Sequence, residues 1–374
     1  MTDWTSIRIG WISRRNRVFA NPRFQHWAAR LPVIRWIARS RADAAFDLLA
    51  GFAYSQVLRA YVEGGLFDIL KDGPLAVESV AARMGMSEAA ALTLLRAGRA
   101  LMLSEEAGPD LWMLGEQGAV FAENAGVQAM VRHHRLLYAD LADPIALLKA
   151  DRREATGLSR FWTYAGALQG TTERGEDTAE YSELMAASQH FVADEVLASL
   201  SFRDVRRLLD VGGGHGAFLK AIGSAWPHLE LGLFDLPEVA ATGGAVLAEQ
   251  FGTARTAAHP GNFFEDAVPQ GYDMVSLVRI LHDHDDAPAQ ALLANIRRSL
   301  APGARLLIAE PMARIRGAEP MGEAFFGLYL WAMGSGRARS PDEIIAMLRA
   351  AGFASARLVA TAQPVNASVV IARA

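Results

Sequence analysis

A glycine-rich turn near the middle of the chain has residues suited to binding a nucleotide-like ligand. In the run LLDVGGGHG (208–216), an apolar segment reaches Asp210 and then passes through Gly212 and Gly214 into a helix that begins at Ala217. Glycines let backbone N–H groups and a helix N-terminus approach a ligand without side chains in the way. The same spacing satisfies the relaxed fingerprint of dinucleotide sites. The turn by itself is compatible with a dinucleotide or with S-adenosylmethionine.

Ionisable side chains occur at the ends of four predicted strands. Besides Asp210, these are Asp235, the pair His282 and Asp283, and Glu310. In an open α/β sheet, ligands bind at the carboxyl ends of the strands, where the strand order reverses. A carboxylate after the second strand, the position of Asp235, can accept hydrogen bonds from both ribose hydroxyls of a nucleoside. Four such strand ends predict a ligand site rather than a set of solvated loops.

The run His-Asp-His-Asp-Asp (282–286) also raises the alternative of a metal site. In hydrolases with a His-Asp pair, the pair lies inside a helix and further ligands are spaced along other helices, whereas this run follows a strand. A solvated loop with a helix cap at Asp285 or Asp286 explains the last two acids. The chain has no cysteine, which excludes disulfides and thiolate ligands. We therefore expect no metal cofactor.

Alternating strands and helices predict the fold that would bring these residues together. Strands are expected at 207–211, 230–234, 272–277 and 305–309, and helices at 217–225, 238–250, 287–300 and 342–351. Two closing strands, 356–362 and 367–372, are joined by a short loop, so one of them must be antiparallel. The pattern predicts the α/β class, with a Rossmann-like parallel sheet, helices on both faces and a terminal β-hairpin.

The residues before this region predict a helical, winged-helix-like domain. Helices are expected at 42–61, 77–84 and 87–102, with short strands near 103–105 and 111–114. DNA binding is one interpretation, but the would-be recognition helix carries only two arginines and the net charge is −4. A dimerisation domain is the favoured interpretation. We expect a homodimer and no nucleic-acid partner.

Length and composition predict about two domains in a chain of 374 residues. The expected parts are an N-terminal arm (1–41), the dimerisation domain (42–125), a helical connector (126–200) and the ligand-binding domain (201–374). No apolar run reaches the ~18 residues that a membrane-spanning helix needs. The N-terminus has no signal-peptide pattern. We therefore expect a cytoplasmic protein.

The N-terminal arm has an unusual composition. It contains nine arginines against one acid, Asp3, and four of the eight tryptophans. Arginine beside tryptophan suits an anionic membrane interface, where the ring sits among headgroups and the cation stays in water. The alternative is an arm that packs on a partner subunit through its aromatic rings. Peripheral membrane contact and subunit contact both stay open.

Five short motifs resemble a known enzyme family. They are LDVGGGHG (209–216), FDLP (234–237), GNFF (261–264), LHD (281–283) and AEP (309–311). In order and spacing they resemble the class I S-adenosylmethionine-dependent O-methyltransferases of the plant caffeate and acetylserotonin types, over residues ~50–374. The run PRFQHWAAR (22–30) further resembles bacterial enzymes of carotenoid biosynthesis in photosynthesis, which methylate the 1-hydroxyl of demethylspheroidene or hydroxyneurosporene.

The resemblance implies S-adenosylmethionine as the cofactor and S-adenosylhomocysteine as its product. Gly212 and Gly214 would approach the methionine part, with Asp210 nearby, and Asp235 would hold the ribose. The residues implied for the adenine and the methionine carboxylate are Asn262, Phe263 and Arg279, although Arg279 is equally compatible with a surface arginine.

The resemblance implies that His282 is the general base, which takes the hydroxyl proton as the oxygen attacks the sulfonium methyl. Asp283 and Glu310 would orient the base or the substrate. The chain departs from the family at three positions. Asn262 replaces a frequent Asp and His284 a usual Trp, while Ala338 stands where a second acid is expected. Without that acid, Glu310 would have to support His282 alone.

The substrate pocket implied by the resemblance draws on two helices. Its residues are Tyr181, Met185 and Ser188 on one helix, and Phe325, Leu328, Tyr329 and Met333 on the other. Any one of them could equally be a core residue, but together they are strongly apolar. An apolar pocket predicts a hydroxylated isoprenoid substrate, a 1-hydroxycarotenoid, and a place on the inner, photosynthetic membrane. The alternatives are a phenol or polyketide O-methyltransferase, an NAD-dependent oxidoreductase, and a winged-helix regulator.

Overall fold

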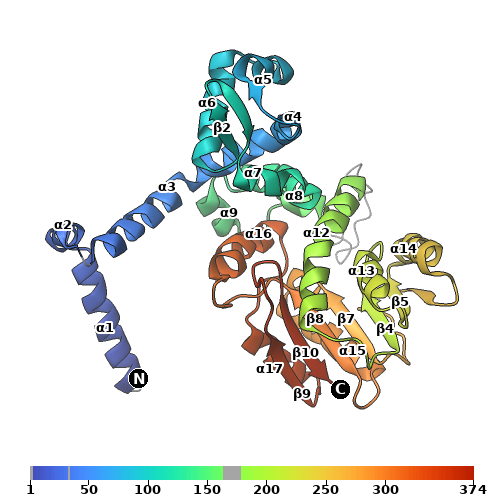
Figure 1. Cartoon of the computed structure of the whole chain (residues 1–374). Helices are drawn as coiled ribbons and strands as arrows, with labels where there is room; N and C mark the ends of the chain where they lie inside the picture. Colours follow the sequence, from blue (N-terminus) through green and yellow to red (C-terminus); the bar gives the residue numbers. More distant parts are fainter. Residues whose placement is uncertain (1–2, 33, 163–177) are drawn as a thin grey trace. The chain divides into compact units, whose positions relative to one another are not determined.

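A computed structural model describes residues 3–32, 34–162 and 178–374, except for the side chains of Asp3 and of residues 178–188 (Figure 1). The chain divides into two compact units, 1–123 and 124–374. The predicted division into four parts by residue number stays a prediction.

A seven-stranded sheet forms the centre of the second unit (Figure 1). In spatial order its strands are β6 (Thr256–Pro260), β5 (Glu230–Asp235), β4 (Arg207–Val211), β7 (Met274–Val278), β8 (Arg305–Glu310), β10 (Ser368–Arg373) and β9 (Ser355–Val359). The strands from β6 to β8 are parallel, and the order reverses between β4 and β7. Strand β10 is antiparallel to both β8 and β9. The predicted α/β class with a terminal hairpin is confirmed.

Helices cover both faces of this sheet (Figure 1). They are α12 (Thr178–Ser199), α13 (Ala217–Ala225) and α14 (Pro237–Phe251) on one face, and α15 (Asp286–Ser299) and α17 (Pro341–Ala350) on the other. Side chains alternate along a strand, so Leu208 packs with the first group and Leu209 with the second. Burial on both faces explains the continuous apolar runs of the central strands. It also holds the loops at their carboxyl ends in place.

Strand β6 is missed by the sequence analysis. Its residues are half-buried or exposed, and it pairs only with β5 at the edge of the sheet. An edge strand does not need the apolar run that marks a central strand. The other predicted strands and helices of the sheet are confirmed to within three residues.

Several helices of the second unit pack outside the sheet. They are α8 (Ala125–Asp140), α9 (Pro144–Ala150), α10 (Gly157–Phe161) and α16 (Phe326–Met333), which follows a π-helical turn at Pro320–Phe325. The expectation of helix throughout 126–200 is wrong at 141–143 and at 151–156. Asp151 and Arg152 have φ of 52° and 60°, a left-handed conformation that ends α9.

The first unit contains the predicted winged-helix-like domain. Its elements are α4 (Leu66–Leu70), β1 (Leu75–Ala76), α5 (Val77–Met84), α6 (Glu88–Ala100), β2 (Ser104–Gly108), β3 (Leu111–Leu114) and α7 (Glu116–Ala122). Gly85, with φ of 65°, ends α5, and the Ser87 hydroxyl accepts a hydrogen bond from the Ala90 N–H to cap α6. The three strands form a small antiparallel sheet.

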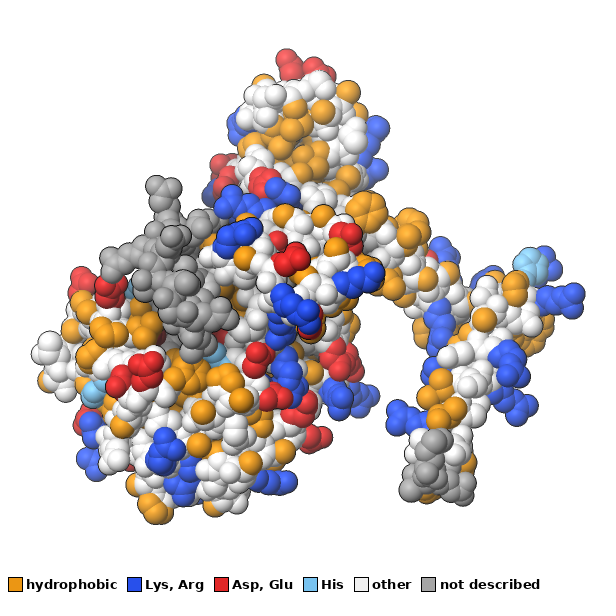
Figure 2. Space-filling view, turned by 180° about the vertical axis from the view of Figure 1, so that it is seen from behind, with side chains coloured by type: hydrophobic (Ala, Val, Ile, Leu, Met, Phe, Trp, Pro, Cys, Tyr) orange, Lys and Arg blue, Asp and Glu red, His pale blue; other side chains and the backbone are white. Residues whose placement is uncertain are grey.

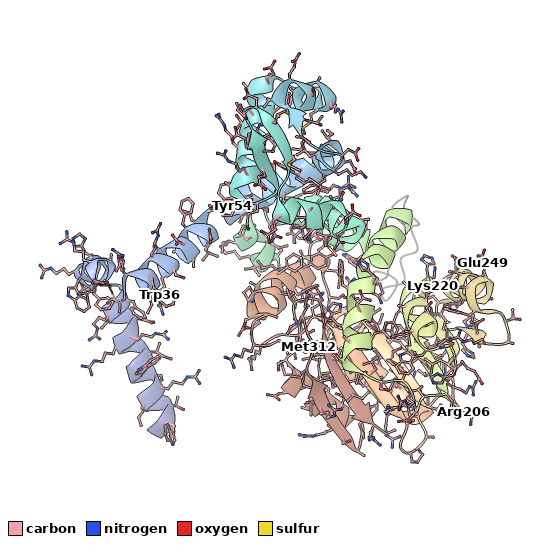
Figure 3. All side chains as sticks on the ribbon, in the orientation of Figure 1. Trp36, Tyr54, Arg206, Lys220, Glu249 and Met312 are labelled. Carbon is pink, nitrogen blue, oxygen red and sulfur yellow. The ribbon has the colours of Figure 1, made fainter. Side chains whose placement is uncertain are left out.

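The arm is helical, which the sequence analysis does not predict. It forms α1 (Asp3–Phe19) and α2 (Pro22–Arg30), and α3 (Arg35–Glu63) begins seven residues before the expected helix at 42. Trp36 lies in the first turn of α3 (Figure 3). Phe46, Leu49 and Phe52, spaced three residues apart along α3, are 60%, 72% and 76% exposed in the single chain. An apolar face of this kind marks a contact surface.

Candidate active site

Three glycines in left-handed conformations form the turn after β4. Gly212, Gly214 and Gly216 have φ of 71°, 57° and 76°, a region that residues with a side chain disfavour. A Cβ atom at Gly212 would lie 2.6 Å from Ile280 Cδ1, whereas one at Gly214 would meet no atom within 4 Å. The turn therefore presents open backbone at Gly214, directly before α13.

Asp210 lies inside β4 and is buried beneath this turn. The Ser276 hydroxyl of the neighbouring β7 donates to Asp210 Oδ1 at 2.6 Å. Asp210 Oδ2 has no hydrogen-bond partner among the described residues. Burial raises the pKa of Asp210 to about 7. A buried acceptor of this kind requires a donor, and a bound ligand is one source.

Asp235, the last residue of β5, contacts the glycine turn directly. Its two carboxylate oxygens accept hydrogen bonds from the N–H groups of Gly214 and Leu236, at 2.8 and 2.7 Å. Burial raises its pKa, and these two N–H groups oppose the rise. The structure thus brings Asp235 and Gly214 together at the carboxyl edge of the sheet.

Asn262 and Phe263 follow β6 at the same edge. Asn262 Oδ1 accepts from the Phe264 N–H at 3.0 Å, so the amide oxygen already has one partner. The Phe263 carbonyl accepts from Asn295 Nδ2 of α15 at 2.9 Å. The His284 ring, at the position where the family that the sequence resembles usually has tryptophan, stands edge-on to Phe264 at 5.0 Å between centroids. Burial lowers the pKa of His284 to about 4, so it is a neutral aromatic ring.

His282 lies in a single 3₁₀ turn, Leu281–Asp283, that follows β7. It is buried, and its ring packs against Phe326 with centroids 5.6 Å apart. Its Nε2 lies 3.3 Å from Asp283 Oδ1. Burial, and then the positive charge of Arg279, lowers the pKa of His282 well below the usual range. The imidazole is therefore neutral at physiological pH.

Glu310, the last residue of β8, supports the backbone of His282 and not its ring. Its Oε2 accepts from the His282 N–H at 3.1 Å. Glu310 Oε1 and His282 Nδ1 are buried without hydrogen-bond partners in the described part of the chain. Burial raises the pKa of Glu310 to about 8. The acid thus fixes the position of the histidine loop.

Arg339 is a site residue that the sequence analysis missed. Its guanidinium is fully buried and donates to the carbonyl oxygens of Leu281 and His284, at 2.8 and 2.7 Å. It also pairs with Asp286 at 2.8 Å. The only sequence signal was the missing acid at Ala338, which instead packs in the apolar cluster around Tyr329. A buried guanidinium on two carbonyls, rather than a second acid, holds the loop on both sides of His282.

The structure places Asp285 at the predicted helix-cap position, but its carboxylate does not act as a cap. Asp285 stands at the N-cap of α15 but makes no capping hydrogen bond with its side chain. Asp285 Oδ1 accepts from Arg152 at 2.9 Å and from the Gly336 N–H at 3.1 Å, and Asp286 pairs with Arg337 and Arg339. Arginines from distant segments bind these carboxylates, so the carboxylates do not accept from the first N–H groups of the helix. Such long-range pairs cannot be read from local sequence spacing.

A pocket opens at His282 and Asp283. Its remaining lining residues are Trp162, Arg279, Phe326, Tyr329 and Leu330. Arg279 is half-buried and faces this pocket, which argues against the surface alternative. Its φ of 57° is unusual for a residue with a side chain, and its N–H donates to the Ala309 carbonyl of β8 at 2.9 Å. The pocket combines a neutral base and one cation with apolar walls.

The structure places one of the residues predicted for the substrate pocket, Tyr329 of α16, in the wall of this pocket. Tyr329 lines the pocket, but Phe325, Leu328 and Met333 are not among its lining residues. Phe326, Tyr329 and Leu330 share one face of α16 because residues three and four apart are neighbours on a helix. Phe325 belongs to the preceding π-helical turn, and Met333 is buried in the apolar cluster of α8, α10 and α16.

Three further points concern the remaining pocket residues, a metal ion and membrane-spanning helices. The side chains of Tyr181, Met185 and Ser188 lie outside the described residues. Across the described ranges, no group of three His, Asp or Glu side chains is placed to hold a metal ion. The helices that the structure describes include none that is long and apolar enough to cross a membrane.

Comparison with known domain families identifies both units. Residues 46–124 match the O-methyltransferase dimerisation domain, and residues 138–354 match the O-methyltransferase domain. The first match supports a homodimer. The winged-helix-like unit is thus a dimerisation domain, as the weakly basic helix indicated.

Individual proteins agree with this assignment. The chain is 41% identical over 358 residues to the demethylspheroidene O-methyltransferase of Cereibacter sphaeroides, covering 95% of this chain and 93% of that protein. It is 40% identical to the enzyme of the same name from Rhodobacter capsulatus, covering 97% and 90%. The solved structure of LaPhzM superposes with a TM-score of 0.71 at 27% identity, covering 89% of this chain and 98% of that one. The chain therefore belongs to the O-methyltransferase family, and S-adenosylmethionine is its methyl donor.

Proposed function

We propose that this enzyme methylates the 1-hydroxyl group of an acyclic carotenoid of the demethylspheroidene or hydroxyneurosporene type. The observation that carries the proposal is the pocket at His282, because Trp162, Phe326 and Leu330 give it aromatic and aliphatic walls. Such walls favour a long apolar molecule. The relatives named demethylspheroidene O-methyltransferase support the proposal, since about 40% identity extends over nearly the whole chain.

The glycine turn is suited to S-adenosylmethionine, which supplies a methyl group on a positively charged sulfur when it is bound. Gly214 has open space beside its backbone, and the buried Asp210 Oδ2 is an acceptor without a partner among the described residues. We expect Asp235 to hold the ribose, and Asn262 and Phe263 to border the adenine. Arg279 stays our candidate for the methionine carboxylate, and a cation suits that role.

His282 is the general base in this proposal. Its imidazole is neutral, which is the form that accepts a proton from a substrate hydroxyl. Asp283 Oδ1, 3.3 Å from Nε2, would stabilise the imidazolium that results. A tertiary hydroxyl is far less acidic than a phenol. His282 must therefore take the proton during methyl transfer and not before it.

Incubation of the enzyme with labelled S-adenosylmethionine and a panel of 1-hydroxycarotenoids and phenols tests the substrate. We expect label in the hydroxycarotenoids. Label found only in phenols would contradict this proposal and indicate a phenol or polyketide O-methyltransferase.

The same assay tests the general base. His282→Ala should abolish turnover while the Kd for S-adenosylmethionine stays near that of the wild type. Full activity of the His282→Ala variant would show that His282 is not the general base.

We also propose that the arm contacts an anionic membrane surface, where a carotenoid substrate would reside. Trp4, Trp11 and Trp27 are 81%, 62% and 54% exposed, and arginine and apolar side chains lie beside one another along the arm (Figure 2). The Arg15 guanidinium lies over the Trp11 ring at 5.1 Å. Exposed tryptophans with arginines suit the headgroup region of a bilayer.

At least part of the arm belongs to the similarity with the demethylspheroidene O-methyltransferases. The alignment to the Cereibacter sphaeroides enzyme leaves out about 5% of this chain, fewer residues than the arm contains. The dimerisation-domain match begins only at residue 46. Part of the arm therefore lies within the similarity to a demethylspheroidene O-methyltransferase and outside the common domains.

Co-sedimentation with lipid vesicles tests the membrane proposal. The full chain should bind vesicles that contain phosphatidylglycerol more strongly than pure phosphatidylcholine vesicles, and salt should weaken the binding. Replacing Trp4, Trp11 and Trp27 by alanine should reduce it. Equal sedimentation of the wild type and the triple alanine variant, or no sedimentation with either kind of vesicle, would contradict membrane contact. Packing of the arm on the partner subunit would then be the remaining interpretation.

A further inference from the structure

The Tyr329 hydroxyl is the centre of a buried polar network in the pocket wall. Trp162 Nε1 lies 3.0 Å from this hydroxyl and His133 Nε2 lies 2.8 Å from it. All three side chains are buried, and they come from α16, the residue after α10, and α8. Three separate elements therefore hold one hydroxyl group among apolar residues.

The protons of this network can be assigned from the chemistry of its members. An indole N–H is only a donor, so Trp162 donates to the tyrosine oxygen. Burial lowers the pKa of His133 to about 4, so this ring is neutral and carries its proton on either Nδ1 or Nε2. His133 Nδ1 is buried without a partner among the described residues. A buried N–H without an acceptor is rarer in proteins than a buried acceptor without a donor, which favours the proton on Nε2.

This tautomer decides the direction of the Tyr329 hydroxyl. If both Trp162 and His133 donate, the two lone pairs of the phenolic oxygen are occupied. The phenolic proton must then point away from both partners. Tyr329 lines the pocket that also contains His282 and Asp283, and an oxygen atom of a bound substrate there would be its acceptor.

We propose that Tyr329 donates a hydrogen bond to the oxygen that is methylated, and that Trp162 and His133 hold the tyrosine in this orientation. The inference rests on the proposed function, since it assumes a hydroxylated apolar substrate at His282. Tyr329 would stabilise the negative charge that develops on the oxygen as His282 removes its proton. Burial raises the pKa of Tyr329, so the phenol keeps its own proton. A weakly acidic alcohol gains most from such a donor.

Binding of a matched pair of ligands tests this role. The pair is a 1-hydroxylated acyclic carotenoid and its hydroxyl-free parent, which share the apolar chain. The wild type should bind the hydroxylated member about 3- to 10-fold more tightly. Tyr329→Phe should lose this preference, bind the parent as the wild type does, and lower kcat at saturating S-adenosylmethionine. A preference that survives in Tyr329→Phe would overturn the proposal.

Tyr272→Phe is the matched control. It removes another buried tyrosine hydroxyl bonded to a histidine, His259, at 2.7 Å and away from the pocket, so it should keep the ligand preference. A wild type that methylates no hydroxycarotenoid would instead contradict the proposed function, and that failure is seen before any variant is compared.

The histidine tautomer gives a second test, which is read in the wild-type protein. In protein labelled with ¹⁵N-histidine, the His133 signals, assigned by their loss in His133→Gln, should show a protonated Nε2 and a bare Nδ1. A proton on Nδ1 would make Tyr329 the donor to His133 and remove it as a donor to substrate. This measurement decides the proposal even if Tyr329→Phe folds poorly.

Discussion

At the scale of single residues, Asp210, His282 and Glu310 are ionisable side chains that the fold removes from water. Burial shifts each pKa toward the neutral form, upward for the two acids and downward for the histidine. A neutral imidazole is the form of a general base that is ready to act. A protonated Glu310 avoids placing a full negative charge beside the His282 backbone. Measurements of turnover and of thermal stability against pH can therefore test these pKa shifts.

The acidic limb of the pH–rate profile should move to higher pH in Arg279→Gln. The positive charge of Arg279 lowers the pKa of both His282 and Asp283. Removing it raises both pKa values, so the shift has the same sign whichever group controls the limb. The measurement is kcat against pH at saturating S-adenosylmethionine. An unchanged limb would show that neither group titrates in the active complex.

Glu310→Gln should make the thermal stability less dependent on pH. The pKa of Glu310 is about 8 in the folded chain and 4.5 at its usual value. The folded state therefore binds more protons between these values, and the free energy of unfolding falls as pH rises through this range. Glutamine keeps an acceptor for the His282 N–H and does not titrate. The Tm of the wild type should fall more steeply between pH 5 and 8 than that of the variant, and parallel curves would count against this.

Asp235→Asn should weaken binding of S-adenosylmethionine about 10- to 100-fold, because hydrogen bonds to a charged group contribute roughly 1.5–3 kcal/mol. Asp273→Asn is the matched control. Asp273 also accepts two backbone N–H groups, from Arg206 and Arg207, but at the opposite edge of the sheet. Calorimetric titration compares the two, and equal losses would attribute the effect to the fold and not to the ribose.

At the scale of elements, the loop after β7 is held by a segment far along the chain. Gly336 has φ of 79°, and a Cβ there would lie 2.1 Å from the His282 carbonyl oxygen. That carbonyl accepts from the Arg337 N–H at 2.9 Å. Arg339 binds the carbonyls on either side of the histidine. The segment that lacks the acid of related enzymes thus positions the base through its backbone.

Arg339→Met should destabilise the enzyme by about 3–5 kcal/mol, because it leaves buried carbonyl groups without a donor. Turnover should fall at least about 10-fold. Arg337→Met is the matched control, since the Arg337 side chain is 39% exposed and also pairs with Asp286 but donates to no loop carbonyl with its side chain. A partly exposed ion pair contributes only about 1 kcal/mol or less. Similar losses of Tm and kcat in both variants would contradict a specific role for Arg339.

At the scale of the whole molecule, the exposed apolar face of α3 belongs to the dimerisation domain. Phe52→Asp should shift the enzyme toward monomers, since it places a charge in a surface that two chains would bury. Analytical ultracentrifugation measures the change. Leu358→Asp places the same charge on β9, at an exposed apolar residue outside the dimerisation domain that is 42% exposed, and this variant should stay dimeric. A dimeric Phe52→Asp variant would remove this face of α3 from the interface.

Local patterns determined a large part of this protein. The α/β alternation, the glycine turn after β4 and the acids Asp235 and Glu310 at strand ends followed from the sequence, because each depends on residue type over a few positions. The helices of the arm and the edge strand β6 did not. Apart from Ala28, their described residues are exposed or half-buried, so they lack the apolar runs of core elements.

Tertiary structure alone decided how the site is assembled. That Glu310 holds the backbone of His282, and that Arg339 replaces a missing acid, depends on contacts between segments far apart in the sequence. The face of α16 that meets the pocket depends on its rotation after the π-helical turn. Residue type and spacing determined which chemistry was available, because they encode local conformation. Packing between distant segments decided which atoms meet, because hydrogen bonds and burial depend on distance in space.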